Sequence, residues 1–275
     1  MPEGHTIHRA ARLQRAALAG HTLAVDSPQG RFAAGAALLD GRVLRDVEAY
    51  GKHLLYHWEH GQILHVHLGL YGAFRMLPRA RSASGAPEPL PPVSAGTRLR
   101  IVAADTVLQL AGPTVCELID PSARERLVAR LGPDPLRRDA DPDRAWRALQ
   151  RRTVAIGAAL LDQKVLCGVG NVFRAESLFL ERVHPERPSR ALTREQFDDL
   201  WATLVRALRR GERAGRIVTV EPADVGVATR SRVPAGERFY VYKRAGLACR
   251  RCATPIRASV SALRSMYACP TCQAN

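Results

Sequence analysis

The chain begins Met1-Pro2-Glu3-Gly4-His5, and this start could carry a chemical reaction. A small second residue such as proline lets the initiator methionine be removed, which would leave Pro2 as a terminal secondary amine beside the carboxyl group of Glu3. A free α-amine titrates near pH ~8 and a lysine side chain near ~10.4, so at neutral pH the terminal amine is richer by roughly a hundred-fold in its neutral, nucleophilic form. Attack of a secondary amine on an aldehyde-level carbon gives an iminium that cannot lose its charge by deprotonation of nitrogen, and Glu3 is at hand as a proton carrier. Many proteins begin Met-Pro, so the start by itself indicates only a possible nucleophile.

The C-terminal region contains a second chemical pattern, two C-x2-C knuckles on either side of residues 253–268. The knuckles are Cys249-Arg-Arg-Cys252 and Cys269-Pro-Thr-Cys272. Two closely spaced thiolate pairs, brought together by a short hairpin, predict one structural Zn²⁺ held by the four cysteines. Four protein thiolates leave no open position, which disfavours a catalytic zinc. Cys116 and Cys167 stand singly among apolar residues and are expected to pack in the core.

The segment between the knuckles is basic and predicts two short strands around a turn, over residues 255–268. Four arginines lie within 249–272, where no acidic residue offsets them: Arg250, Arg251, Arg257 and Arg264. A hairpin stiffened by zinc would present guanidinium groups to a phosphate backbone. The alternative is a zinc ribbon that serves protein contacts.

Composition agrees with a polyanionic partner. The 275 residues include 41 Lys+Arg against 26 Asp+Glu, a net charge of +15, which favours nucleic acid ahead of a membrane surface, with a merely basic soluble protein as the alternative. No apolar run approaches the roughly 18 residues of a membrane span, and the start lacks the apolar run of a signal peptide. We therefore expect a cytoplasmic protein, and disulfides are rare in that compartment. The chain is long enough to form two domains.

The first half of the chain predicts a helix followed by short strands. Thr6 to Leu18 has helical apolar spacing and ends at Gly20. From His21 to about Leu110 the pattern changes to short alternating runs separated by turn residues, which predicts an antiparallel sandwich. The predicted strands are 43–47, 52–58, 63–68, 72–76 and 99–102, and Pro78 to Gly96 is predicted as a loop. His65 and His67 share one face of a strand and could suit a metal, but without a third ligand we expect a structural role, as for His5 and His8.

The second half predicts helices after a proline-rich linker at 131–142. The expected helices are 143–150, 156–166, 171–181 and 193–210, and Thr193-Arg-Glu-Gln196 resembles a capping box at the start of the last. Between the second and third helices, Cys167-Gly168-Val169-Gly170-Asn171 predicts a tight turn that exposes backbone amides, where a phosphate can dock.

Several motifs occur together in one order along the chain. They are Pro2-Glu3-Gly4, Tyr50-Gly51-Lys52-His53-Leu54-Leu55, Leu161-Asp162-Gln163-Lys164 leading into Gly168-Val169-Gly170-Asn171, and a C-terminal four-cysteine hairpin with Arg264 ahead of Cys269. With these motifs the chain resembles the formamidopyrimidine-DNA glycosylase/endonuclease VIII family of base-excision repair enzymes, over essentially its whole length.

The resemblance implies roles for individual residues. Pro2 would be the nucleophile that attacks C1′ of the damaged nucleotide, Glu3 the general acid/base, and Lys52 a residue near that nucleotide and its phosphate. Asn171 would hold the DNA backbone together with Arg264. The implied catalytic set is Pro2, Glu3, Lys52 and Arg264, and the implied DNA-binding set is Leu70, Tyr71, Lys164, Gly170, Asn171 and Arg264. Glu176 and Lys164 match positions near the terminal amine and the turn.

The resemblance also implies the fold class, α+β. We expect an N-terminal helix with a catalytic antiparallel β-sandwich domain at 2–130, the linker at 131–142, a helix–two-turn–helix DNA-binding domain at 143–235, and a zinc-finger β-hairpin at 236–275.

Details of the motifs favour the endonuclease VIII branch, which prefers oxidised pyrimidines. Gly4 stands where the other branch usually has leucine, and Leu70-Tyr71 aligns with the family's gap-filling wedge, although glycine replaces the expected glutamine at Gly69. These two residues are wedge candidates, with buried strand-end residues as the alternative. Residues 112–115 lack the Arg-Phe pair of the other branch, and 221–236 lack its Thr-Thr-Leu loop. One departure points the other way: His5 and Thr6 replace the familiar Pro-Glu pair, which removes a carboxylate often found near the active site.

The predicted function is thus a bifunctional glycosylase/lyase that removes oxidised bases, with pyrimidines first, through an iminium at Pro2 and nicks DNA by β,δ-elimination. The alternatives are an oxidised-purine glycosylase of the same family, a non-catalytic DNA-damage binder and a zinc-ribbon RNA-associated protein. The expected partner is damaged duplex DNA. We expect the protein to be a monomer in the cytoplasm of a bacterial-type cell, associated with the nucleoid.

Overall fold

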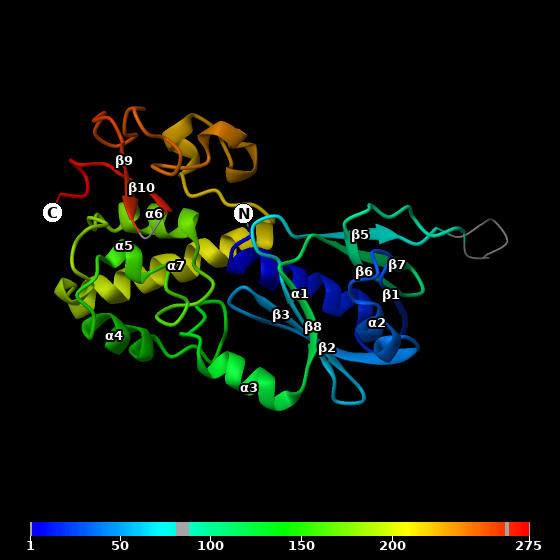
Figure 1. Ribbon diagram of the computed structural model, residues 1–275. Helices are drawn as coiled ribbons and strands as arrows, with labels where there is room; N and C mark the ends of the chain where they lie inside the picture. Colours follow the sequence, from blue (N-terminus) through cyan, green and yellow to red (C-terminus); the bar gives the residue numbers. More distant parts are fainter. Residues whose placement is uncertain (1, 81–87, 262–263, 275) are drawn as a thin grey trace. The chain divides into compact units, whose positions relative to one another are not determined.

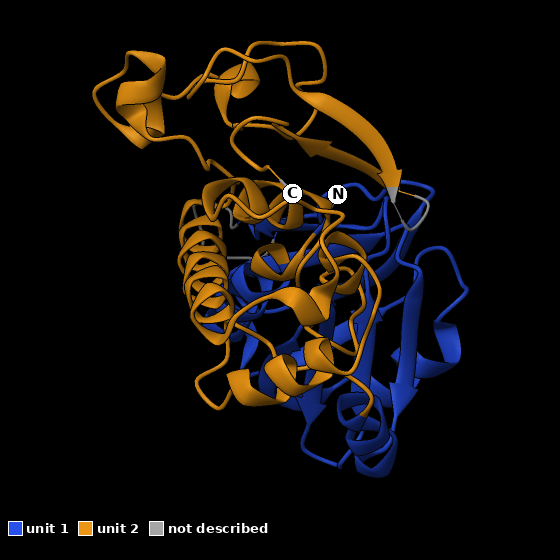
Figure 2. Ribbon diagram, turned by 90° about the vertical axis from the view of Figure 1, so that its left-hand side faces the viewer, with its two compact units in different colours: residues 1–2, 7–129 blue, residues 3–6, 130–275 orange. Residues whose placement is uncertain are grey.

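The computed structural model describes residues 2–80, 88–261 and 264–274. The chain forms two compact units, coloured separately in Figure 2. Unit 1 comprises Met1–Pro2 and Ile7–Ala129, and unit 2 comprises Glu3–Thr6 and Arg130–Asn275. No helix within the described ranges is both long and apolar enough to cross a membrane.

Unit 1 is an antiparallel sheet with short helices. Helix α1 (Gly4–Leu18), which is labelled in Figure 1, has its first residues, up to Thr6, in unit 2 and the rest in unit 1. The strands are β1 (Thr22–Asp26), β2 (Arg42–Tyr50), β3 (His53–Trp58), β4 (Ile63–His67), β5 (Ala73–Pro78), β6 (Thr97–Val102), β7 (Thr106–Ala111) and β8 (Val115–Ile119). The other helices are α2 (Ala33–Leu39) and α3 (Pro121–Ala129).

The strand order is β5-β7-β6-β1-β2-β3-β4-β8. Only two residue pairs, Thr22↔Val43 and Leu23↔Arg42, are registered between β1 and β2, so the sheet consists of two four-stranded halves joined at this point. One core receives apolar side chains from both halves and from α1, which is how a sandwich buries its inner faces. The contributors include Ile7, Leu18, Val47, Leu54, Leu64, Ile101, Leu108 and Leu110.

Unit 2 is helical and ends in a hairpin. Its helices are α4 (Pro142–Gln150), α5 (Ile156–Ala159), α6 (Asn171–Leu180) and α7 (Arg194–Ala214), followed by short 3₁₀ turns at Pro222–Val225, Arg230–Arg232 and Ala235–Glu237. Another 3₁₀ turn, Ser189–Ala191, precedes α7. The hairpin pairs β9 (Arg257–Ser261) with β10 (Arg264–Ala268).

The hairpin shares the core of unit 2. Cys249, Ile256, Met266 and Cys269 are buried in one cluster with the apolar side chains of α6 and α7. The amide of Gln273, itself fully buried, donates to the carbonyl oxygen of Val183 at 2.9 Å. The cysteine-rich end is therefore packed on the helices of its own unit.

The structure confirms the predicted fold class and several local predictions. The capping box is present, with Thr193 accepting from Gln196 N–H and the Gln196 side chain accepting from Thr193 N–H. The predicted strands and the 255–268 hairpin lie where expected, give or take a few residues at their ends. Of the predicted loop at 78–96, residues 81–87 lie outside the described residues.

One predicted helix is wrong. The sequence pattern predicts a helix over residues 156–166, but α5 ends at Ala159. The Asp162 carboxylate accepts the N–H of Lys164 at 2.9 Å, and the Asp162 carbonyl accepts the N–H of Val165 at 2.9 Å. Aspartate thus caps a local turn in competition with helical hydrogen bonds, as short polar side chains often do.

Candidate active site

The carboxyl group of Glu3 is held at the N-terminus of α6. It is completely buried, and its two oxygens accept backbone N–H groups from Gly170 (3.0 Å), Val172 (2.9 Å) and Phe173 (3.4 Å). The first N–H groups of a helix have no partner within the helix, and the helix dipole places partial positive charge there. A negative charge on Glu3 is therefore stabilised at a fixed position, one peptide bond from Pro2.

Two glycines make room for this arrangement. The N–H of Gly4 donates to the carbonyl oxygen of Gly168 at 2.7 Å, and a Cβ on Gly4 would lie 2.9 Å from the Cα of Gly168. A Cβ on Gly170 would collide with the Glu3 carboxyl group. Gly4, which the sequence indicated only as a mark of one branch, is thus required by the close approach of two backbones.

The other predicted catalytic residues of the N-terminal half belong to unit 1. Pro2 is half-buried and precedes α1, while Met1 lies outside the described residues. Lys52 is half-buried in the tight turn between β2 and β3, next to Gly51, whose φ is +58°. Peptide linkage places the Pro2 ring beside Glu3, whereas the role of Lys52 stays a prediction.

Asn171 and Arg174 tie α6 to the hairpin. Both donate to the carbonyl oxygen of Ser265, at 3.0 Å each, and Arg174 also donates to Asn171 and to Gly157 O (3.1 Å). Arg174 is fully buried, and burial lowers its pKa to about 10, so it stays cationic at neutral pH. These bonds fix the backbone next to Arg264, which is itself exposed. Sequence reasoning missed Arg174, because nothing in the local pattern marks an arginine for burial.

Glu176 organises a second segment of unit 2. Its buried carboxylate accepts the N–H groups of Tyr240, Val241 and Tyr242, each at 2.8 Å, and the hydroxyl of Thr219. Burial raises the pKa of Glu176, and the four hydrogen bonds oppose that rise. The structure therefore gives Glu176 a backbone-holding role.

Tyr242 lies within the electrostatic reach of two predicted site residues. Burial raises its pKa, the charge of Glu3 adds to the rise, and Arg264 opposes it. Its ring makes an edge contact with Tyr267, with centroids 5.5 Å apart. Sequence reasoning missed Tyr242 as well; the signal available was an aromatic residue directly before Lys243-Arg244.

The remaining predicted DNA-binding residues are on the surface. Lys164 is exposed, and Leu70 and Tyr71 are 45% and 90% exposed, so they are not buried strand-end residues. Gly69 has a φ of +67°, and a Cβ there would collide with the Thr114 hydroxyl, which explains glycine where glutamine was expected. The turn at 167–171 is buried, and the N–H groups of Gly168 and Gly170 donate to Gln163 and Glu3, so the prediction that this turn exposes backbone amides to a phosphate is wrong. The side chain of Asn171 is engaged with Ser265, as described above.

The four predicted zinc ligands converge. The sulfur atoms of Cys249, Cys252, Cys269 and Cys272 all lie within 4.8 Å of one another. Backbone N–H groups of Arg251 and Cys272 approach the sulfurs of Cys249 and Cys269 at 3.4 Å, as in knuckles that stabilise thiolates. Among the described residues this is the one cluster of His, Cys, Asp or Glu suited to a metal ion. His65 instead bonds to Glu117 (3.0 Å) and His53 (2.9 Å), consistent with a structural role.

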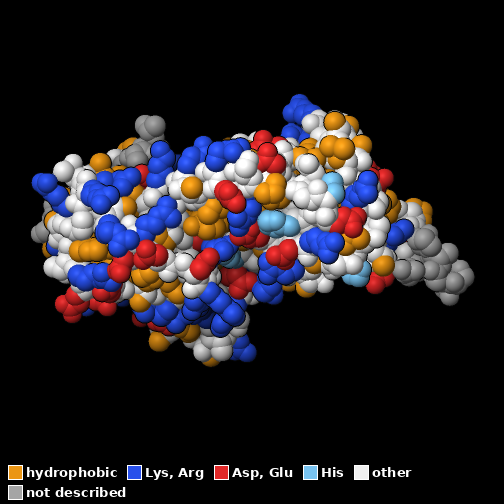
Figure 3. Space-filling view, turned by 90° about the horizontal axis from the view of Figure 1, so that it is seen from below, with side chains coloured by type: hydrophobic (Ala, Val, Ile, Leu, Met, Phe, Trp, Pro, Cys, Tyr) orange, Lys and Arg blue, Asp and Glu red, His pale blue; other side chains and the backbone are white. Residues whose placement is uncertain are grey.

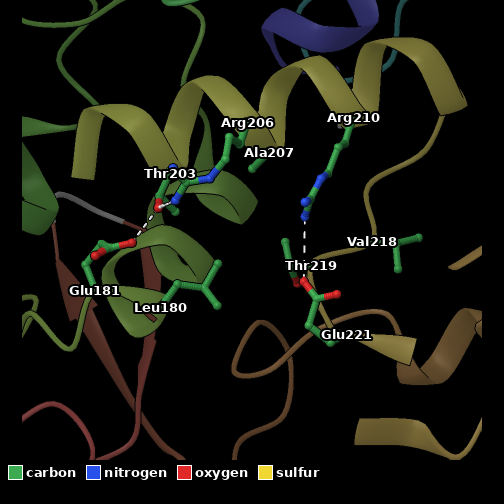
Figure 4. Close-up of a pocket in the computed structure, with 9 residues that line it drawn as sticks. All are labelled: Leu180, Glu181, Thr203, Arg206, Ala207, Arg210, Val218, Thr219 and Glu221. Atoms are coloured by element: carbon green, nitrogen blue, oxygen red, sulfur yellow. Dashed lines mark hydrogen bonds and ion pairs between the residues drawn. The ribbon is translucent and has the colours of Figure 1, made fainter. Parts of the chain in front are cut away.

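A cavity of about 220 Å³ lies elsewhere in unit 2, between α6, α7 and residues 218–221. Arg206 and Arg210 project into it from α7, and Arg210 approaches Glu221 at 3.6 Å (Figure 4). Arg206 donates to Thr203, which in turn donates to Glu181. The lining includes none of the predicted site residues, and its charges are largely paired with one another.

Comparisons with known proteins agree on one family. The formamidopyrimidine-DNA glycosylase N-terminal domain matches residues 1–127, and the formamidopyrimidine-DNA glycosylase H2TH domain matches residues 131–221. The chain is 48% identical to endonuclease 8 1 of Mycobacterium tuberculosis over 275 residues, covering 99% of this chain and 100% of that protein. It is 35% identical to a probable endonuclease 8 2 of Streptomyces coelicolor, covering 100% and 94%.

Solved structures show the same fold. The MutM (Fpg) protein of Thermus thermophilus superposes with a TM-score of 0.74 at 33% identity, covering 99% of this chain and 98% of that one. Lactococcus lactis Fpg, crystallised with DNA containing N7-benzyl-Fapy-dG, superposes with a TM-score of 0.79 at 23% identity, covering both chains completely. The chain therefore belongs to the formamidopyrimidine-DNA glycosylase/endonuclease VIII family of DNA glycosylases, on its endonuclease VIII branch.

Proposed function

We propose that the chain is a bifunctional DNA glycosylase/AP lyase of base-excision repair that acts through Pro2. The observation that carries the proposal is the Glu3 carboxyl group, buried completely and held by three amides of α6 beside a residue that becomes the terminal amine. Such a fixed carboxyl next to a secondary amine suits the shuttling of protons at a sugar carbon.

In the proposed reaction the Pro2 nitrogen forms a bond to C1′ of the damaged nucleotide, and the bond from C1′ to the base breaks. The Glu3 carboxylate takes the proton from the Pro2 nitrogen and passes it to the ring oxygen as the sugar ring opens, which leaves an iminium between Pro2 and C1′, and the departing base takes a proton from water. The iminium draws electrons from C2′, so that loss of a C2′ proton expels the 3′ phosphate. A second elimination releases the 5′ phosphate and leaves a one-nucleotide gap with phosphate at both ends.

The proposed partner is damaged duplex DNA. A base within a duplex cannot be reached, so its nucleotide must leave the stack, at a cost of a few kcal/mol that damage reduces. Leu70 and Tyr71, exposed next to the turn at Gly69, are the proposed wedge that fills the gap. Lys52, Lys164 and Arg264 are proposed to meet the phosphates, with Asn171 fixing the backbone beside Arg264. On the face drawn in Figure 3, Lys and Arg side chains are interspersed with Asp and Glu side chains.

We propose oxidised pyrimidines as the preferred lesions. The support is the branch, because the relatives at 48% and 35% identity described above are both named as endonuclease 8 proteins. The alternative, an oxidised-purine glycosylase, is favoured by relatives such as the formamidopyrimidine-DNA glycosylase of Thermus thermophilus, which is 33% identical.

We propose that the four-cysteine cluster holds one structural Zn²⁺. Four sulfurs within 4.8 Å of one another suit tetrahedral coordination by thiolates, with no position left for a substrate. The metal would fix the hairpin that carries Arg264, and it takes no part in the proposed reaction.

Removing the metal should abolish DNA binding while unit 1 stays folded. Without zinc, thiolate repulsion would loosen the hairpin and the part of the unit 2 core formed by Ile256 and Met266, whereas unit 1 has its own core. Fluorescence anisotropy with labelled duplex and calorimetric melting, before and after chelation, would check this. Returning Zn²⁺ should restore binding; duplex binding that survives chelation would contradict the structural role.

The proposed function is tested with duplex oligonucleotides that each carry one lesion. We expect borohydride to trap a covalent adduct on DNA containing an oxidised pyrimidine or an abasic site, with strand scission in its absence. A panel including 8-oxoguanine ranks the substrates, and faster cleavage of the purine lesion would overturn the pyrimidine preference. A protein that only binds DNA would give a salt-sensitive complex and no adduct, which would overturn the enzymatic proposal.

A further inference from the structure

The turn that holds Glu3 has little secondary structure of its own. Residues 165–170 are all buried, yet they belong to no helix or strand. Buried backbone N–H and C=O groups need hydrogen-bond partners, because each one left unpaired is costly. Backbone groups outside the segment supply several of those partners, and the side chain of Gln163 supplies the partners of the Gly168 N–H and the Val169 carbonyl.

Gln163 uses both ends of its amide. Its Oε1 accepts the N–H of Gly168 at 3.0 Å, and its Nε2 donates to the carbonyl oxygens of Val169 (3.1 Å) and Leu161 (2.9 Å). Among the side chains, only an amide offers one acceptor and two donors on a single planar group. Glutamate would keep the bond to Gly168 and lose the two carbonyl contacts.

The contact with Val169 bears directly on Glu3. The carbonyl of Val169 and the N–H of Gly170 belong to the same peptide group, which is planar and trans, so the two bonds point in opposite directions. Fixing the Val169 oxygen therefore aims the Gly170 N–H, and that N–H donates to the Glu3 Oε2 at 3.0 Å. On the other side of the turn, the Gly168 carbonyl oxygen accepts the N–H of Gly4 at 2.7 Å.

We propose that Gln163 is a positioning residue for Glu3, acting through the peptide group that joins Val169 to Gly170 and through the N–H of Gly168. It touches neither the nucleophile nor, in the proposed reaction, the DNA. Its task is to hold the turn so that the carboxyl group stays ionised and correctly placed beside Pro2. The inference rests on the proposed function, because it assigns Glu3 a proton-transfer role.

The test compares Gln163→Leu and Gln163→Glu with the native protein. We measure single-turnover base release as a function of pH, the affinity for abasic duplex, and thermal unfolding. Gln163→Leu should slow base release about ten- to a hundred-fold, since a small misplacement of a catalytic group has effects of this size, with little change in affinity. A weaker hydrogen bond from the Gly170 N–H disfavours the ionised form of Glu3. In Gln163→Leu, the inflection of the rate–pH profile that belongs to Glu3 should therefore move to higher pH. That inflection is identified as the one that Glu3→Gln removes.

Gln150→Leu is the matched control. Gln150 is also half-buried in unit 2, and its amide donates to a backbone carbonyl, that of Leu192 at 3.5 Å, so this variant reports the effect of losing such a contact on stability alone. Gln163→Glu, which keeps the Gly168 contact, should give an intermediate rate. Native rates and an unmoved inflection in Gln163→Leu would overturn the inference, while failure of the native protein to form any adduct would overturn the proposed function instead.

Discussion

Replacing Pro2 by glycine should abolish efficient trapping of the protein on abasic or oxidised DNA. The variant still loses Met1, but its terminal amine is primary, so an imine formed on it can lose its proton and stop drawing electrons from the sugar. Removing the nucleophile of an enzyme can cost several orders of magnitude in rate, and we expect a loss on the order of a thousand-fold or more. Single-turnover strand scission and borohydride trapping measure it.

The experiment needs two checks on the protein itself. Mass spectrometry must show that Met1 is absent from both the native protein and the variant, since a retained methionine would block the amine in either. Peptide mapping of the trapped native adduct should place the DNA on Pro2. If Pro2→Gly traps as efficiently as the native protein and peptide mapping places the DNA away from the chain terminus, another amine such as Lys52 is the nucleophile and the proposed mechanism is wrong.

Features set by short-range spacing could be predicted from the sequence. The two cysteine knuckles predicted a four-sulfur cluster because each pair is fixed locally and one hairpin brings the pairs together, as the structure shows. The capping box at Thr193 and the helix it begins follow from residues three apart. The alternation of apolar and polar residues likewise located the strands that have one buried face and one exposed face.

Contacts between distant parts of the chain could not be predicted in this way. Glu3 pairs with amides near residue 170, and Glu176 with those of 240–242, and no local pattern encodes either partnership. The same limit hid Arg174, whose charge is stabilised by carbonyl groups from Gly157 and Ser265. Helix α3 was missed because it buries no side chain, so its apolar periodicity is weak.

The wedge loop shows how structure explains a departure that sequence could only note. The sequence has glycine at Gly69, where the resemblance leads to the expectation of glutamine. Its positive φ disfavours any residue with a Cβ, and such a residue would also displace the Thr114 hydroxyl. Only Leu70 and Tyr71 therefore offer large side chains at this point, and they are the residues to consider as a wedge.

Glu3→Gln should separate the two activities proposed for this chain. Base release requires a proton at the sugar while the base departs, so losing the acid/base group should slow it by about 10²–10⁴-fold. At a preformed abasic site the base has already gone and the open sugar presents an aldehyde, so Pro2 can still attack. We therefore expect trapping on abasic DNA to be reduced far less than release of an oxidised base, with both measured in single turnover on matched duplexes.

Glu3→Gln also changes the hydrogen bonds at this site, and the structure indicates that the change lowers the stability of unit 2. Both oxygens of Glu3 accept N–H groups, so the amide nitrogen of glutamine must face a donor at Gly170 or Val172 and leave it unpaired, at a cost of about 1–3 kcal/mol. Unit 2 should melt earlier for this reason, and rates must be compared below that transition. Glu3→Ala is the second variant, because it removes the carboxyl group altogether and leaves the N–H groups of Gly170, Val172 and Phe173 without this partner. If both variants release an oxidised base at the native rate, the buried carboxyl group serves only to cap α6, and the proton transfers belong to another group.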